Sequence, residues 1–391
     1  TGKALGASGL AWLKVHISNS WGFDKASLED RVEWTENNED MIMRIGIDPL
    51  ESREWMDADK PWQFLRACFE YVCCNNNEDY VSHLPVTVDG SCNGLQHFSA
   101  MLRDDIGGAA TNLINHEQPE DIYEIVRREA ENAMVLDNNP EFNIWGSGGC
   151  LSRALVKRPV MTTPYGATLY GMRDQIHEEL KKQLDKGVVF PGIDSSTDMW
   201  PHCKYLAFNI YEAIGRVVIS SRLGMKWLQD VAKASNKLKR PIYWTLPTGF
   251  VVKQKYIRSI VKEIKTIING RMASLFAGSS DAEKMHSFRQ VNGIAPNFVH
   301  SLDACHLMKT IVSARDNHGI ESFAVVHDSF GTHACDIEQL GMVLRETFVD
   351  IYKEDILKKF MEEQGDLELP SLPEYGKLNI EDVKNAEFFF S

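Results

Sequence analysis

The spacing of apolar residues along the chain predicts more helix than strand. Apolar side chains recur every three or four residues over six segments: 27–43, 61–71, 118–136, 177–184, 201–237 and 337–360. Residues 11–16 fit a short strand or a helix equally well. A few short segments with β-branched residues and turn residues predict strands, so the pattern indicates an α+β fold.

One predicted strand leads through a tight turn into a helix. Val86 and Val88 are β-branched strand formers, and Asp89-Gly90-Ser91 has the composition of a turn. Apolar residues then return at helical spacing from Leu95. The turn leaves the carboxylate of Asp89 at the end of the strand, where a single aspartate is more often a helix N-cap than a catalytic group.

A second aspartate lies far downstream in a predicted hairpin. Residues 323–334 have the pattern of a strand, a short turn and another strand, with Asp328 at the turn. Two aspartates at strand ends, one before a helix and one in a hairpin, can share a pair of divalent metal ions. Because Asp89 and Asp328 are far apart along the chain, a shared metal pair also requires the fold to bring the two strand ends together.

A basic stripe lies on a second predicted helix, residues 153–165. Four residues are spaced by four and would lie along one face: Arg153, Lys157, Met161 and Tyr165. Because of Pro159 and Pro164, we expect this helix to be kinked or to end near Pro164. A solvated basic face is the usual meaning of one or two cations. Three cations in this segment, Arg153, Lys157 and Arg158, followed by an aromatic residue and Gly166, instead suit a polyanion held by fixed charges.

The most basic stretch has few acidic residues and contains Lys253, Lys255, Arg258, Lys262, Lys265 and Arg271. An exposed ribbon or helix face and a nucleic-acid contact explain this composition equally well. Further on, we expect turns at Asn292-Gly293 and Pro296 before a helix that carries His300. A single histidine in such a place would more often be structural than functional.

Composition narrows the class of protein. The 391 residues are enough for two or three domains or one large one, and 43% hydrophobic content fits a packed globular protein. No apolar run is long enough for a transmembrane helix. The net charge of −13 argues weakly against nucleic acid, although a groove can be locally basic. The eight scattered cysteines suit free buried thiols in a reducing cytosol, and a start without Met suggests a longer polypeptide.

Four stretches resemble the signature motifs of the single-subunit, bacteriophage-type DNA-dependent RNA polymerases. They are Asp89-Gly-Ser-Cys-x-Gly-Leu-Gln-His-Phe, Arg153-x3-Lys157-x7-Tyr165-Gly166, Gly293-Ile-Ala-Pro-Asn-Phe-Val-His300 and His327-Asp328-Ser-Phe-Gly. They occur in the family's order, and the likeness extends from Trp12 to the Phe-rich C-terminus. The chain resembles the C-terminal catalytic half of such an enzyme. We therefore expect the family's N-terminal domain and thumb to lie outside this sequence, and the missing N-terminal half of the same polypeptide to be a partner of this half.

The resemblance implies a right-hand architecture, with mostly helical fingers around a small antiparallel palm sheet. Residues 1–110 would form the palm and a palm-associated segment with the first aspartate. Residues 111–299 would form the fingers, including a promoter-reading loop at about 253–284, and residues 300–391 the C-terminal palm with the second aspartate. The implied activity is DNA-templated RNA synthesis from ribonucleoside triphosphates by a nucleotidyltransferase.

Roles for individual residues follow from the same resemblance. Asp89 and Asp328 would bind two Mg²⁺ ions, and Gly90 would offer its carbonyl to one of them. Arg153 and Lys157 would grip the incoming triphosphate, and Lys157 would also protonate the leaving pyrophosphate. These assignments place the catalytic chemistry on Asp89, Lys157 and Asp328.

Five further residues would contact the nucleotide. Lys25 would add a phosphate contact, and Tyr165, followed by Gly166, would pack on the ribose and the templating pair. His300 would help to favour ribose, and Tyr123 falls where the family has a tyrosine near the nucleotide. We therefore expect a site that selects ribonucleotides.

The remaining expected partners are the DNA template, the promoter and the nascent RNA. The promoter contacts would come from Lys253, Lys255, Arg258 and Arg271. The sequence Lys157-Arg158-Pro-Val-Met favours a phage enzyme over an organellar one. A phage enzyme would act in the cytoplasm of an infected bacterium.

Three other functions are weighed against this one. A DNA polymerase of the same architecture is disfavoured because the motif after Asp89 has no Glu to exclude ribose, and because His300 suits an RNA-making enzyme. A hydrolase using His327, Asp328 and Ser329 is disfavoured because neighbours on a strand point to opposite faces. A non-catalytic nucleic-acid-binding module would need the basic residues but not both aspartates.

Overall fold

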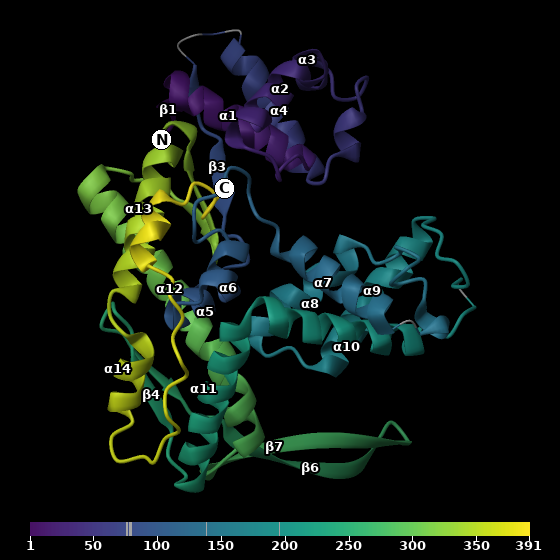
Figure 1. The fold of residues 1–391 in the computed structure, drawn as a ribbon, viewed down its shortest axis with the longest axis vertical. Helices are drawn as coiled ribbons and strands as arrows, with labels where there is room; N and C mark the ends of the chain where they lie inside the picture. Colours follow the sequence, from purple (N-terminus) through teal and green to yellow (C-terminus); the bar gives the residue numbers. More distant parts are fainter. Residues whose placement is uncertain (76, 78–79, 138, 195) are drawn as a thin grey trace.

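The computed structural model describes residues 1–75, 77, 80–137, 139–194 and 196–391. Helices predominate, and the strands form small antiparallel sheets, which confirms the α+β prediction (Figure 1). None of the helices among the described residues combines the length and hydropathy that a membrane crossing needs. All eight cysteines are free thiols, and three of them, Cys68, Cys203 and Cys305, are buried.

The N-terminal part is a small helical unit. It contains α1 (Gly6–Trp21), α2 (Leu28–Asn37), α3 (Glu39–Ile47), η1 (Glu54–Asp57) and α4 (Pro61–Asn75), with β1 (Lys3–Ala4) paired to β2 (Val81–Ser82). Leu13, Ile42 and Phe64 belong to its apolar core. Residues 11–16 are therefore helical. The prediction of a single helix over 27–43 is wrong, because α2 ends and α3 begins at Asn38. Ser27 caps α2, since its Oγ accepts from the Asp30 N–H at 3.1 Å.

A three-stranded antiparallel sheet joins distant parts of the chain. Its order is β3 (Pro85–Asp89), β9 (Ser329–His333) and β8 (Ala324–Val326). The helix predicted after β3 is α5 (Asn93–Leu102), followed by α6 (Asp105–Ala110). The predicted strand–turn–helix and the predicted hairpin are both confirmed. Their pairing is what places the two aspartates on one sheet.

A helical cluster projects to one side of this sheet (Figure 1). It contains α7 (Ile122–Asp137), η2 (Pro140–Phe142), α8 (Arg153–Thr162), η3 (Thr163–Tyr165), α9 (Leu169–Asp185) and α10 (Trp200–Val217). Its own core includes Val126, Leu155 and Ile210. Helix α8 continues through Pro159 and ends just before Pro164, as predicted.

A long ribbon extends from the molecule beyond α11 (Ile219–Lys237) (Figure 1). A shorter hairpin precedes it, made of β4 (Ile242–Thr245) and β5 (Val251–Gln254). The ribbon itself is β6 (Ile257–Ile268) with β7 (Arg271–Met285). Asn269 and Gly270 form its turn with φ values of 51° and 75°, the positive angles that a two-residue hairpin turn needs. Of the two conformations considered for this basic stretch, the ribbon is correct.

The longest helix crosses a place where turns were predicted. Helix α12 (Ser287–His318) runs unbroken through Gly293 and Pro296, so the predicted turns there are wrong. Ile294 and Phe298 are fully buried in the main core, and this burial outweighs the cost of Pro inside a helix. The Tyr256 ring packs on Gly293, where a Cβ would come within 2.8 Å of it, so this glycine provides space rather than a turn.

The C-terminal part closes the main core. It contains η4 (Ala334–Asp336), α13 (Ile337–Tyr352), α14 (Ile356–Glu363) and η5 (Ile380–Asn385). The helix predicted over 337–360 is thus two helices, and the one predicted over 201–237 is also two, divided at Val218. The last residues return to the sheet, where Phe390 forms a β-bridge with Gly90.

Candidate active site

The sheet brings Asp89 and Asp328 together. Asp89 is the last residue of β3 and pairs with Ser329, while Asp328 stands immediately before Ser329 in the β8–β9 turn. The Gly90 N–H also donates to the Asp328 carbonyl at 3.3 Å. Asp89 is exposed and Asp328 is half-buried, so both carboxylates lie at an accessible end of the sheet.

The electrostatics of this pair favour a cation. Burial raises the pKa of the Asp328 carboxyl, and the charge of Asp89 raises it further. A bound cation would relieve this repulsion. Among the described residues no three His, Cys, Asp or Glu side chains form a metal-binding cluster, so there is no all-protein cage. Two carboxylates that leave positions for phosphate and water fit Mg²⁺. The Gly90 carbonyl accepts from the Cys92 N–H at 3.0 Å and retains a second lone pair.

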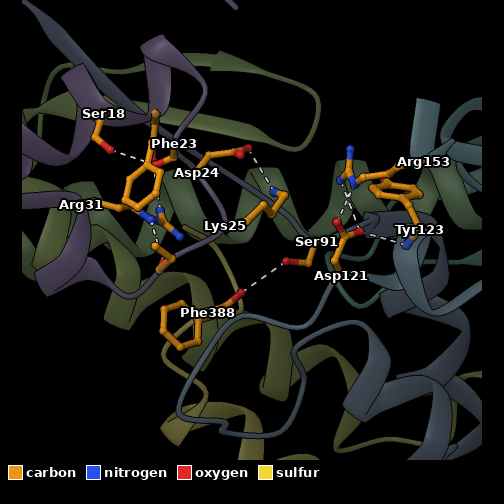
Figure 2. A network of polar contacts seen from close by, with 12 residues as sticks. Ser18, Phe23, Asp24, Lys25, Arg31, Ser91, Asp121, Tyr123, Arg153 and Phe388 are labelled. Atoms are coloured by element: carbon orange, nitrogen blue, oxygen red, sulfur yellow. Dashed lines mark hydrogen bonds and ion pairs between the residues drawn. The ribbon is translucent and has the colours of Figure 1, made fainter. Parts of the chain in front are cut away.

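The C-terminus supports the turn after Asp89. Ser91 Oγ donates to the Phe388 carbonyl at 3.4 Å (Figure 2). The Ser391 N–H donates to the Asp89 carbonyl at 3.2 Å. A Cβ on Gly90 would come within 3.2 Å of the Phe390 ring. The sequence showed a Phe-rich terminus but carried no signal of this contact.

Helix α8 presents its two predicted cations differently. Lys157 is exposed. Arg153 instead forms a two-point ion pair with Asp121, with Nε and Nη2 at 2.5 and 3.2 Å from its carboxylate oxygens. The Arg153 guanidinium also lies over the Tyr123 ring, 4.9 Å from its centroid. Figure 2 shows the three side chains together. Sequence reasoning missed Asp121, which had no signal apart from its place two residues before Tyr123.

Tyr165 and His300 are in direct contact. Their rings stack with centroids 4.4 Å apart and planes 9° from parallel. Burial lowers the pKa of His300, the charge of His327 lowers it further, and Asp328 acts in the opposite direction. Gly166 follows with a φ of 81°, which ends the turn in the left-handed region that favours glycine.

Gly94 is a second residue that the sequence did not single out. A Cβ at this position would come within 2.6 Å of Pro164 and 3.0 Å of the Tyr165 ring. The first turn of α5 therefore packs directly on the residues that end α8. This contact fixes Tyr165 relative to the strand–turn–helix that carries Asp89.

A buried polar pair, Asn93 and Asp303, lies close enough to Asp328 for its charge to act on Asp303. Asn93 Nδ2 donates to Asp303 Oδ1 at 2.6 Å, which joins α5 to α12. Burial raises the pKa of Asp303 to about 6, the Asn93 hydrogen bond opposes this rise, and the charge of Asp328 adds to it. Nothing in the sequence linked these two residues, because they come together only in the folded chain.

The remaining residues singled out from the sequence lie in a loop, in the β8–β9 turn and on the hairpins that follow α11. Lys25 is exposed in the loop after α1, paired with its neighbour Asp24 at 3.0 Å (Figure 2). His327 is in the β8–β9 turn with a φ of 53°, so the premise that it lies on a strand beside Asp328 was wrong. The exposed promoter candidates are Lys253 on β5, Lys255 between the hairpins, and Arg258 and Arg271 on the ribbon.

Comparison with known proteins gives a consistent result. A family model described as DNA-dependent RNA polymerase matches residues 3–366. The chain is 38% identical over 407 residues to "DNA-directed RNA polymerase 2B, chloroplastic/mitochondrial" of Nicotiana tabacum and 34% identical over 443 residues to T7 RNA polymerase of Escherichia phage T7. Both alignments cover 100% of this chain, but 38% and 49% of the relatives, so it spans less than half their length. The motifs around Asp89, Arg153, His300 and Asp328 and this match agree: the chain belongs to the DNA-dependent RNA polymerase family.

Proposed function

We propose that this chain catalyses DNA-templated RNA synthesis from ribonucleoside triphosphates. The observation that carries the proposal is the pairing of β3 with β9, which puts Asp89 and Asp328 at one end of the sheet. The name "DNA-directed RNA polymerase" printed for its relatives supports the same reaction. In the right-hand description, the palm comprises residues 1–110 and 300–391, and residues 111–299 are the fingers. The separate apolar core of α7–α10 supports a distinct fingers unit.

The reaction is an in-line displacement at the α-phosphate. The oxygen of the RNA 3′-hydroxyl forms the new P–O bond and releases its proton to water, and the bond to pyrophosphate breaks. Two Mg²⁺ ions, when bound to Asp89, Asp328 and the Gly90 carbonyl, would stabilise the charge that develops on the attacking and leaving oxygens. The chain contributes the fixed placement of these two carboxylates, which β3, β9 and the C-terminus determine.

Cations on α8 hold the triphosphate. Arg153 and Lys157 are one helical turn apart and point from the same face. The exposed ammonium of Lys157 neutralises the pyrophosphate and gives it a proton as it leaves. Lys25 adds a charge from the N-terminal unit. Tyr123, whose ring lies under Arg153, contributes by fixing that guanidinium rather than by an open contact of its own.

Selection of ribose falls to Tyr165 and His300. Their stacked rings form a flat wall, which suits packing against the sugar and the templating base pair. Gly166 lets the chain turn sharply away after Tyr165. The Tyr165 hydroxyl and the His300 ring nitrogens supply the polar groups that contact the 2′-hydroxyl.

The ribbon β6–β7 is the proposed promoter reader. It is long enough and basic enough to contact DNA, through Arg258 and Arg271 together with Lys253 and Lys255 at its base. The narrower proposal is transcription of phage genes in the cytoplasm of an infected bacterium. The wording Lys157-Arg158-Pro159-Val160-Met161 supports it, while plant organellar and phage relatives match at similar identity.

Primer extension on a preassembled RNA–DNA scaffold tests the class of reaction, because the scaffold bypasses promoter recognition. The assay compares ribonucleotides with deoxynucleotides, in Mg²⁺ and in excess chelator. We expect templated addition of ribonucleotides in Mg²⁺ only. A preference for deoxynucleotides would identify a DNA polymerase of the same architecture. Scaffold binding with neither addition nor a requirement for Mg²⁺ would favour a non-catalytic binding module.

A further inference from the structure

Asp121 makes two kinds of contact with one carboxylate. It stands immediately before α7, where its Oδ1 accepts from the Tyr123 N–H at 3.0 Å and from the Glu124 N–H at 3.4 Å, as an N-cap. The same carboxylate receives Nε and Nη2 of Arg153. Asp121 therefore ties the start of α7 to the first residue of α8.

The Arg153 guanidinium is held on an edge and on a face. Asp121 occupies the Nε–Nη2 edge, and the guanidinium carbon lies over the Tyr123 ring, 4.9 Å from the ring centroid (Figure 2). The Tyr123 hydroxyl in turn interacts with Cys92, which follows the turn that begins at Asp89. A guanidinium has five N–H donors, so the opposite edge keeps donors for a phosphate. Its direction is set by groups that connect to the aspartate turn.

Within the part of the chain that the structure describes, neither of the two other cations on α8 is held by a partly buried carboxylate in the way that Arg153 is. Lys157, one turn further along α8, is exposed and, among the described residues, forms no ion pair. Arg158, on the same helix, pairs with Glu178, but both side chains are more than half exposed, at 57% and 65%. In the Arg153–Asp121 pair the exposed fractions are 34% and 17%. Because less solvent surrounds the Arg153–Asp121 pair, its two side chains are held in one geometry more strongly than those of an exposed ion pair.

We propose that Asp121 is a positioning residue for nucleotide binding. It presets the Arg153 guanidinium in the orientation in which its free edge meets the triphosphate. This inference rests on the proposed function and deepens it. The pre-ordered arginine loses little side-chain freedom on binding, and Lys157 supplies an adjustable charge beside it. A carboxylate near a triphosphate also repels it, so the proposal requires positioning to outweigh repulsion.

The variant Asp121→Asn tests this balance. Asparagine is as good an N-cap as aspartate, so α7 keeps its start while Arg153 loses its charged partner. We expect the KM for ribonucleotides on the scaffold to rise by about tenfold, with kcat changed less than twofold. Glu178→Gln is the matched control, since it removes an ion pair from the same helix, and should leave both constants unchanged.

A double-mutant cycle separates positioning from general damage. Arg153→Ala should raise KM, and adding Asp121→Asn should then have no further effect. The dissociation constant of inorganic tripolyphosphate, measured by calorimetry on the same variants, reports the same contact without catalysis. If the two substitutions had additive effects on KM, or if Asp121→Asn bound tripolyphosphate more tightly, the positioning role of Asp121 would be wrong. The proposed function would not be affected by either result. If Arg153→Ala changed neither KM nor tripolyphosphate binding, the triphosphate site itself would be wrong.

Discussion

At the scale of single residues, the site depends on carboxylates held close together. The pKa of Asp328 rises because of burial and the charge of Asp89, and the charge of Asp328 raises the pKa of Asp303. The chain therefore contains a local excess of negative charge. Such an excess costs stability in the absence of a cation, and perturbed carboxyl pKa values of this kind are common at functional sites.

The Asp303 carboxyl gives a pH-dependent prediction. Its pKa rises from an ordinary 3.8 to about 6 in the folded protein. The folded state thus holds the proton more tightly than the unfolded state, and this stabilisation is complete below about pH 4 and lost as pH rises through 6. Asp303→Asn keeps the acceptor for Asn93 but does not titrate.

Urea unfolding at pH 4 to 7 checks this prediction. Relative to Asp303→Asn, the wild-type free energy of unfolding should fall by about 2 kcal/mol over this range. Parallel pH profiles for the two proteins would show that the Asp303 carboxyl titrates normally.

Tyr165 carries a prediction about the sugar. Tyr165→Phe keeps the ring that stacks on His300 but removes the hydroxyl. We expect discrimination between ribo- and deoxynucleotides to fall by about tenfold, the worth of one hydrogen bond, with little change in the rate for ribonucleotides. Competitive incorporation of the two nucleotides on the scaffold measures it. An unchanged ribose preference would remove the role given to Tyr165.

The candidate site was predictable from sequence to the extent that it lies in contiguous motifs. Asp89, Asp328, Arg153 and Tyr165 each stand in such a stretch. Asp121 and Asp303 do not, because their importance comes from contacts with Arg153 and Asn93 that only the fold creates.

At the scale of elements, local propensity predicted whether a segment is helix or strand better than it predicted where each helix begins and ends. For the stretch that forms β6–β7, the sequence left a ribbon and a helix face both open. The end of α8 follows from proline chemistry. Helix α12 does not, because Asn292-Gly293 and Pro296 look like turns locally while Ile294 and Phe298 are buried around them. Tertiary packing overrides propensity there.

The contact between α5 and the end of α8 gives a prediction at Gly94. In Gly94→Ala the new Cβ would meet Pro164 at 2.6 Å and the Tyr165 ring at 3.0 Å. We expect a loss of about 1–3 kcal/mol in stability and a raised KM for nucleotides, because Tyr165 must shift. Chemical denaturation and scaffold extension measure the two effects.

Gly278→Ala is the control, since a Cβ at this ribbon position meets nothing within 4 Å. Equal behaviour of the two variants would mean that the first turn of α5 is not tightly packed against Tyr165.

At the scale of the whole molecule, three apolar cores surround the site. The N-terminal unit, the α7–α10 cluster and the main core each contain their own buried residues. The ribbon stands apart (Figure 1), and most of its described side chains are exposed. Composition alone pointed away from nucleic acid, because the net charge of −13 hides the local basic groups on α8 and the ribbon.

Shortening the ribbon tests its separate role. Replacing residues 264–275 by Asn-Gly removes Lys265 and Arg271 and keeps a two-residue turn. We expect unchanged thermal stability and scaffold extension, and a decrease of about 2 in the slope of log affinity for duplex DNA against log salt. An unchanged slope would show that these two cations do not contact phosphates.

The most direct test of the central claim is the rate of ribonucleotide addition in Asp89→Asn and Asp328→Asn. Asp350→Asn, which removes an exposed partner of Lys309, is the matched control. We predict losses of at least about a thousandfold in the first two variants, equivalent to about 4 kcal/mol of transition-state stabilisation, and none in the control. Mg²⁺ should raise the melting temperature of the wild type but not of Asp328→Asn. Substantial activity in either aspartate variant would contradict the assignment of these two carboxylates as the catalytic centre.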